Sequence, residues 1–173
     1  MEGLELFDTF RSSAFRLETR QEYSVPEEEE LLRACREGRP LAGRPDVEDW
    51  LGYVRGVVAG GRTMDRVHVV ESPLSEYLTC EFALYELSAA AGESIRIAER
   101  SVDERLDAMR SDFWLFDNQV LLWLHYDGAG RLTGSAISRA ERDVAWCREQ
   151  RDLALRLSVP FSSFGRFEVP AAV

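Results

Sequence analysis

The hydrophobic pattern in the middle of the chain predicts a strand–helix–strand unit. Residues 66–70 form a short β-branched run bounded by turn signals, which is typical of a buried strand. Hydrophobic residues then recur at helical spacing over 74–91, with Ser72 as the expected N-cap and Pro73 at the first helical position. A second strand follows at 94–98. Two neighbouring strands joined through a helix are expected to be parallel, with a right-handed crossover.

The C-terminal part of the chain has a different pattern and predicts a β-meander. Residues 112–117 and 120–126 are aromatic and aliphatic runs separated by a tight turn, which indicates a β-hairpin. A glycine-containing turn leads to a third strand at 131–137. A last helix is expected over 139–157, capped by Ser138. Its arginines and acids are interleaved, as in a solvated helix with surface ion pairs.

The N-terminal part supplies one predicted strand and two predicted helices. Residues 14–18 alternate and suggest an edge strand. Four consecutive acids open an apolar-periodic segment over 27–35, and acids in a first turn favour a helix. Asp46 is the expected N-cap of a helix over 46–59.

These elements together predict one α/β domain. We expect a mixed sheet of about five or six strands with a central βαβ unit, a C-terminal hairpin or meander, and helices on both sheet faces. Residues 1–45 would form a strand and helix packed on the body, 46–158 the α/β core, and 159–173 an aromatic-rich tail that packs on the body or on a partner.

Composition agrees with a single globular domain and restricts the partners. The chain has 173 residues, 45% hydrophobic and 30% charged, with a formal net charge of −10. An acidic protein repels nucleic acid and anionic lipid, so we expect neither as a direct partner. No apolar run is long enough for a membrane span, and the first residues do not resemble a secretory signal.

The basic residues exclude several kinds of chemistry. All 21 are arginine, and no lysine is present. A lysine Schiff base, pyridoxal-phosphate catalysis and a Walker A lysine are therefore excluded. Arginine can bind anions or pair with carboxylates, but it cannot act as a general base near neutral pH.

Cysteine and glycine spacing predict neither a metal nor a cofactor. Cys35, Cys80 and Cys147 are far apart and odd in number, and no zinc-ligand spacing exists. We therefore expect reduced thiols and a cytoplasmic protein. The glycines form no Gly-x-Gly-x-x-Gly array between a strand and a helix, so a dinucleotide site is not expected.

Candidate site residues come from polar side chains inside predicted elements. His68 lies in a strand and is either bonded to a neighbour or available for proton transfer. Glu81 lies one helical turn after Tyr77 on the face expected to meet the sheet. It is either a structural partner of Arg66 or Arg96, or an acid that faces a ligand.

Two aspartates flank the aromatic strand of the hairpin. Asp117 fits turn chemistry, and Trp114 fits either the core or a surface that stacks on a ligand. The residues predicted to bind a ligand or partner are therefore Arg66, His68, Tyr77, Glu81, Arg96, Asp112, Trp114 and Asp117.

A family resemblance rests on five segments: Ala14–Glu18, Arg66–Val70, Pro73–Tyr77, Ala91–Glu93 and Asp112–Asp117. In combination they resemble a family of small acidic actinobacterial proteins known only as a domain of unknown function, over about residues 6–157. Members of that family are often encoded near helix-turn-helix regulators, which implies a regulatory accessory role.

The order of elements is also distantly similar to one half of the phospholipase D-like fold. Active members of that superfamily carry His-x-Lys-x-x-x-x-Asp. When the motif is aligned on Asp117, Arg110 stands at the histidine position and Asp112 at the lysine position. The resemblance therefore implies a catalytically empty relative that is used for sensing a ligand.

Three functions remain open from the sequence. The leading hypothesis is a non-enzymatic cytoplasmic domain that binds a small molecule or a protein, such as a transcription regulator. The first alternative is an enzyme that uses Glu81, Asp112 and His68 in a cleft at the carboxyl ends of the strands. The second is a structural homodimer that associates through the hairpin or the tail.

Overall fold

The computed structural model describes residues 3–164 and is built around a mixed sheet. Its strands are β1 (Ser13–Glu18), β2 (Thr63–Val70), β3 (Ser94–Glu99), β4 (Asp112–Phe116), β5 (Val120–Tyr126), β6 (Leu132–Ser138) and β7 (Val159–Pro160). Within the described residues they form one seven-stranded sheet in the order β6-β5-β4-β1-β2-β3-β7. The predicted α/β class is confirmed, with slightly more strands than expected.

The central βαβ unit is present as predicted. β2 and β3 are parallel, and the helix α4 (Glu76–Ala91) joins them. β1 is also parallel to β2. The connection between these two strands contains the short 3-10 helix η1 (Pro26–Glu28), α2 (Glu29–Arg36) and α3 (Pro45–Ala59). The meander of β4, β5 and β6 is antiparallel throughout.

The prediction that residues 14–18 form an edge strand is wrong. β1 lies near the middle of the sheet, parallel to β2 on one side and antiparallel to β4 on the other. Ala14 through Glu18 are all buried. The charged residues Arg16 and Glu18 are buried because neighbouring strands supply opposite charges, Asp112 from β4 and Arg66 from β2.

The predicted helix caps are shifted, although the helices themselves are present. α4 begins after Ser75, whose Oγ accepts a hydrogen bond from the Leu78 backbone N–H at 3.1 Å. Ser72 is therefore not the N-cap, and the Ser72–Pro73 peptide lies in the preceding loop in the cis form.

At α3 and α6 the predicted capping residues also lie beside the observed caps. α3 has Arg44 at its N-cap, and Asp46 lies inside its first turn. The helix α6 (Glu141–Leu157) has Ala140 as its N-cap, and the Ser138 Oγ accepts from the Ala140 N–H just before it. A propensity pattern locates a helix end only to within a few residues.

The predicted hairpin closes through three residues, Asp117–Gln119, between the paired ends of β4 and β5. Asp117 and Asn118 have φ values of 53° and 57°, and the Gln119 N–H donates to the Phe116 carbonyl at 2.9 Å. Positive φ at both central residues of the four-residue turn from Phe116 to Gln119 is the pattern of a type I′ turn, whose twist suits the flanking strands. The Asp117 carboxylate also accepts from the backbone N–H groups of Arg11, Ser12 and Ser13, and thus fixes the start of β1.

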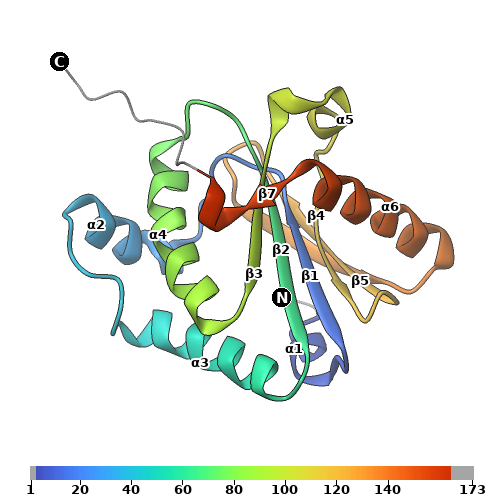
Figure 1. Cartoon of the computed structure of the whole chain (residues 1–173), viewed down its shortest axis with the longest axis horizontal. Coiled ribbons are helices and arrows are strands. Elements are labelled where there is room, and N and C mark those ends of the chain that lie inside the picture. The colour runs from blue at the N-terminus through green and yellow to red at the C-terminus, as the bar shows by residue number, and fades with distance from the viewer. Residues whose placement is uncertain (1–2, 165–173) are drawn as a thin grey trace.

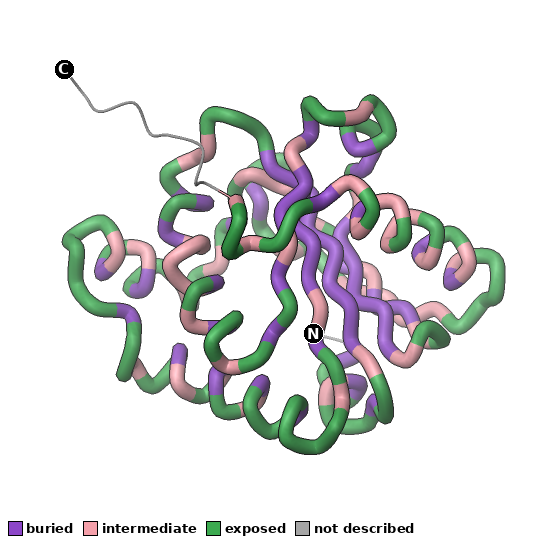
Figure 2. Tube along the Cα trace, viewed as in Figure 1, coloured by how far each residue is buried: buried purple, intermediate pink, exposed green. Residues whose placement is uncertain are grey.

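The helices form two layers on opposite faces of the sheet (Figure 1). α6 covers one face, and α2, α3 and α4 cover the other, together with the short α1 (Glu5–Thr9). The short η2 (Arg100–Val102) and α5 (Glu104–Asp107) follow β3. The central strands are buried between these layers (Figure 2).

The cysteines of the two helix layers differ in bonding state. On the α2 side, Cys35 and Cys80 form a disulfide that links α2 to α4, so the prediction of free thiols is wrong for these two residues. Their separation of 45 residues gave no spacing signal, and only the fold brings them together. Cys147 is a free thiol on the buried face of α6.

The described part of the tail packs on the body of the domain. β7 pairs with β3, and the following 3-10 helix η3 (Phe161–Ser163) places Phe161 against Phe82 and Tyr85. Residues 165–173, including the rest of the aromatic-rich segment, lie outside the described residues. Among residues 3–164, no helix has the length and apolar character needed to cross a bilayer.

Candidate ligand-binding site

A cavity of about 510 Å³ lies between the sheet and the layer of α2, α3 and α4. Strands β1, β2, β4 and β5 form its floor, and α4 and α3 supply most of its walls. Its lining is rich in aromatic rings: Phe7, Tyr23, Trp50, Tyr77, Tyr85, Trp114 and Tyr126. It also contains seven charged or titratable acidic and basic side chains: Arg16, Glu18, Glu28, Asp46, Arg66, Glu81 and Glu93.

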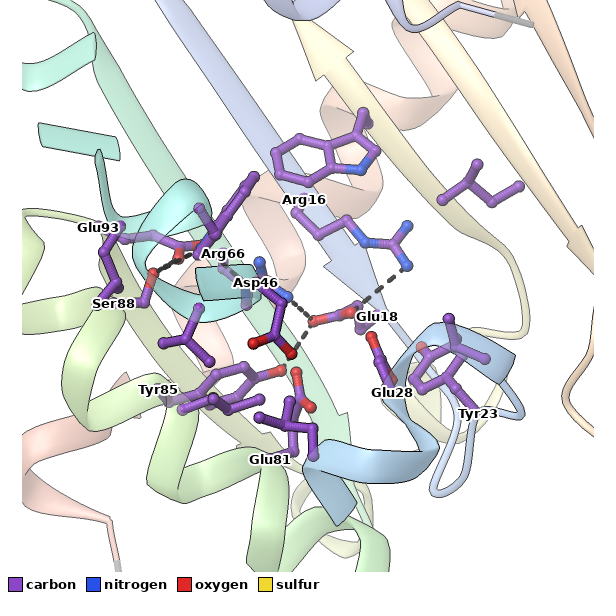
Figure 3. Close-up of a pocket in the computed structure, with 18 of the residues that line it drawn as sticks. Arg16, Glu18, Tyr23, Glu28, Asp46, Arg66, Glu81, Tyr85, Ser88 and Glu93 are labelled. Carbon is purple, nitrogen blue, oxygen red and sulfur yellow. Dashed lines mark hydrogen bonds and ion pairs between the residues drawn. The ribbon is translucent and has the colours of Figure 1, made fainter. Parts of the chain in front are cut away.

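Strand alternation explains why charges lie on the floor. Arg16 of β1 and Arg66 of β2 are register partners, so both side chains point toward the cavity from adjacent strands. Glu18 lies two residues after Arg16 on the same face and contacts both guanidinium groups (Figure 3). Its Oε2 is 2.6 Å from Arg66 Nη1, and its Oε1 is 3.5 Å from Arg16 Nη2.

A hydrogen-bond chain connects this floor to α3 and α4. Arg66 Nε lies 2.7 Å from a carboxylate oxygen of Glu93, which follows α4. The Ser88 hydroxyl of α4 donates to the other Glu93 oxygen, and the Trp50 Nε1–H of α3 donates to Ser88 Oγ at 3.0 Å. This series of hydrogen bonds, from Trp50 through Ser88 and Glu93, fixes the position of the Arg66 guanidinium.

The floor network is ionised at neutral pH. Burial alone would raise the pKa of Glu18, but the charges of Arg66 and Arg16 lower that pKa well below its ordinary value. Burial alone would lower the pKa of Arg66, but Glu18 and Glu93 raise it. Each charge is thus stabilised by its neighbours, as buried ions require.

Asp112 supports the floor from β4. Its carboxylate accepts from Arg16 Nη2 at 3.0 Å, from the Thr19 N–H and hydroxyl, and from the Tyr23 hydroxyl. Asp112 does not line the large cavity, although it contacts a separate hollow of about 170 Å³. It therefore positions Arg16 and Tyr23 in the large cavity instead of facing a ligand there.

His68 is fully buried beneath the cavity wall. Its Nε2 donates to the Arg20 carbonyl at 2.7 Å, and its Nδ1 lies 2.7 Å from the Tyr85 hydroxyl. Burial lowers the pKa of His68, so the neutral imidazole is favoured. Both ring nitrogens therefore have partners within the protein, and the ring does not line the cavity.

Glu81 is an acidic residue of the cavity wall whose carboxyl group has no hydrogen-bond or ion-pair partner among residues 3–164. It extends from α4. Burial, followed by the negative charges of Glu18 and Glu28, raises its pKa to about 8. The predicted pair with Arg66 does not form, because Glu18 and Glu93 occupy that guanidinium.

The predicted pair of Glu81 with Arg96 does not form either. Arg96 alternates with Ile95 and Ile97, so it points to the α6 face, where its guanidinium donates to the Ser158 hydroxyl and carbonyl. Asp117 is also remote from the cavity, in the hairpin turn. Of the eight predicted site residues, the cavity thus brings together Arg66, Tyr77, Glu81 and Trp114.

Several cavity residues were missed by sequence reasoning. Arg16 and Glu18 carried a signal, because two opposite charges at i and i+2 in an otherwise apolar strand point to one face. The aromatic pattern around Tyr85 and Trp50 is also typical of an ordinary core. Glu93 gave no local signal, since only the tertiary structure places it beside Arg66.

The described residues offer a binding surface without metal ligands. Among residues 3–164, no three histidine, cysteine, aspartate or glutamate side chains are grouped so as to hold a metal ion. What the cavity can supply is aromatic contact, hydrogen bonds from phenols and guanidinium groups, and the carboxyl of Glu81.

Comparison with protein families identifies the chain. It belongs to the family described as Domain of unknown function (DUF6879), whose model matches residues 2–166. This confirms the resemblance to a domain of unknown function that the five sequence segments indicated. A comparison with curated proteins gave no match.

Proposed function

We propose that the protein binds a small organic molecule in the cavity between the sheet and α2, α3 and α4, and does not transform it. The family assigns no activity, so the proposal depends on the cavity itself. A volume of about 510 Å³ falls within the usual range of small-molecule sites, about 300–1,000 Å³. A lining that is mostly aliphatic and aromatic, with a smaller number of polar groups, is the usual composition of such sites.

The environment of the acid–base candidates supports binding over catalysis. A general acid or base must reach the substrate directly or through one water. The polar atoms of His68 and Asp112 are engaged in buried hydrogen bonds, and neither side chain lines the large cavity. Of these three candidates, Glu81 is the one whose side chain lines the cavity and could contact a ligand.

A regulatory role is part of the same proposal. Resemblance to proteins encoded beside helix-turn-helix regulators supports a ligand-sensing accessory domain that contacts such a regulator. The net charge of −10 would complement the basic surface of a DNA-binding partner. We also propose a cytoplasmic location. Cell fractionation tests this location: the protein should be recovered with the cytoplasmic contents, and its recovery from the culture medium or the cell envelope would contradict the proposal.

Ligand binding can be tested by thermal unfolding with a small-molecule panel. A ligand at about 100 times its Kd stabilises the folded state by about 2.7 kcal/mol, which raises Tm by about 5–10 °C for a chain of this size. The matched variants are Val47→Phe, which fills the cavity, and Val58→Phe, which adds the same ring on an exposed part of α3. We expect the shift to persist in Val58→Phe and to disappear in Val47→Phe.

Two controls keep this test decisive. Circular dichroism must show that Val47→Phe is folded, and a smaller filling variant, Val47→Leu, repeats the comparison with less steric strain. The proposal is overturned if no compound shifts Tm and native mass spectrometry finds no bound small molecule. It is equally overturned if a shift persists unchanged in a folded Val47→Phe.

A further inference from the structure

The cavity contains more acidic than basic side chains. Its lining has two arginines and five carboxyl groups. Both arginines are already paired: Arg66 contacts Glu18 and Glu93, and Arg16 contacts Glu18 and Asp112. An anionic ligand would have to compete with these short internal contacts, so the charge balance disfavours it.

Glu81 lacks a counter-charge that a ligand could provide. The carboxylates of Glu18, Glu28 and Glu93 face it and raise its pKa, together with burial, whereas Arg66 is the cation that opposes them. The phenols of Tyr77 and Tyr85 are also within electrostatic reach of Glu81, and neither provides positive charge. An ionised Glu81 is therefore costly among these groups, and a cation beside it would remove that cost.

Two aromatic rings of the cavity already contact a cation of the protein itself, the guanidinium of Arg66. The Arg66 guanidinium lies 5.2 Å from the ring centroid of Tyr85 and 6.0 Å from that of Trp114. Within residues 3–164 no arginine lies over the rings of Trp50 or Tyr77, which line the same cavity. Aromatic faces attract cations through the ring quadrupole, most strongly when water is excluded.

We infer that the cavity takes an organic cation, an amine or amidine carried on a planar or apolar body. Its charge would lie at the unpaired Glu81 carboxyl, and its body would pack against the rings of Trp50 and Tyr77. This inference rests on the proposed function, since it names the class of ligand for the same cavity.

Two charge series with a constant ring provide the test. Benzamidine, benzamide and benzoate are nearly equal in shape but carry positive, zero and negative charge, and phenethylamine, phenylacetamide and phenylacetate repeat the series on a longer body. Isothermal titration calorimetry should give a Kd for at least one cation that is about 10-fold or more lower than that of its neutral partner, as expected for a hydrogen bond between charged groups. The acids should not bind.

Proton release provides a second readout. Glu81 is mostly protonated at pH 7, so a cation that binds its ionised form must displace most of one proton. Titrations in buffers of different ionisation enthalpy measure that release. Glu81→Gln should abolish the release and weaken cation binding about 10-fold or more, whereas the matched variant Glu86→Gln, on the exposed side of α4, should change neither.

The outcomes separate the ligand class from the proposed function. Equal or tighter binding of the amide or the acid overturns the cation inference and leaves a binding cavity. Unchanged cation binding in Glu81→Gln overturns the assignment to Glu81. If no probe binds and the panel also gives no shift, the proposed function fails together with the inference.

Discussion

The two faces of the sheet are formed by the same strands, yet they differ in chemistry. Toward α6, β1 and β2 present Phe15, Leu17, Val67 and Val69, which pack into an apolar core. Toward α3 and α4, the alternating positions of the same strands present Arg16, Glu18, Arg66 and His68. One face is a close-packed core, and the other holds a charged network and a cavity.

The difference separates a face that serves stability alone from the face on which we propose that a ligand binds. An apolar core is stabilised by burial without directional partners. A buried charge network costs desolvation energy and is retained only when its partners are in place, so replacing it by apolar residues often does not destabilise a protein. The presence of such a network beside an aromatic cavity therefore favours binding as its role.

The largest expected effect comes from breaking the network. Arg66→Met leaves Glu18 and Glu93 buried without their main counter-charge, which should lower the free energy of unfolding by about 3–5 kcal/mol. Arg96→Met on the adjacent strand removes only hydrogen bonds to Ser158 on the α6 face and should cost about 1 kcal/mol. Urea denaturation measures both, and equal costs would contradict the contrast between the faces.

The next largest effect should come from the disulfide, which links two helices on the cavity face of the sheet. Cys35→Ser removes the link between α2 and α4 and should cost about 2–4 kcal/mol, since the closed loop spans 45 residues. A reducing agent should lower the stability of the wild-type protein by a similar amount and leave Cys35→Ser unchanged. A reductant effect that persists in the variant would show that another group is responsible.

Glu81 should make stability depend on pH in the direction opposite to Glu18. Its folded pKa of about 8 exceeds the ordinary 4.5, so the folded state binds more protons and stability falls as pH rises from about 4.5 to about 8. Glu81→Gln should therefore stabilise the protein by at least about 1 kcal/mol at pH 8–9, with little change at pH 4.

Chemical denaturation across this pH range checks the effect, with Glu86→Gln as the exposed control on α4. For Glu18 the folded pKa is lowered, so its contribution is present above about pH 4.5 and is lost as the pH falls below that value. A Glu81→Gln variant that is no more stable than wild type at high pH would contradict the environment described for this carboxyl.

The smallest predicted effect concerns the start of α4, which carries Glu81. Ser75→Ala removes the cap bond to the Leu78 N–H and the hydrogen bond donated to the Gln21 carbonyl, at a cost of about 1 kcal/mol. Ser72→Ala, at the exposed residue that the sequence suggested as the cap, should change stability by less than about 0.5 kcal/mol. Thermal unfolding ranks the two variants. A larger loss of stability in Ser72→Ala than in Ser75→Ala would show that the helix begins at Ser72.

Local patterns predicted most of the secondary structure. The βαβ unit, the hairpin and the long helices were predicted because their signals lie within a few residues: alternation in a strand, helical spacing, and a turn-forming pair such as Asp117 and Asn118. Four of the eight proposed site residues line the cavity for a similar reason, since polar residues inside apolar elements mark a face.

By itself, the sequence determined the class of fold, the absence of lysine chemistry and the acidic field of the protein, because composition and local periodicity specify these properties. The tertiary structure decided that β1 is central, that Cys35 bonds to Cys80, and that Arg66 pairs with Glu18 and Glu93 while Glu81 stays unpaired. The Arg66–Glu18 pair joins residues 48 positions apart, and the Arg16–Asp112 bond between β1 and β4 joins residues 96 positions apart. No local pattern encodes such distant pairs, since strand order and the packing of helices on the sheet bring them together.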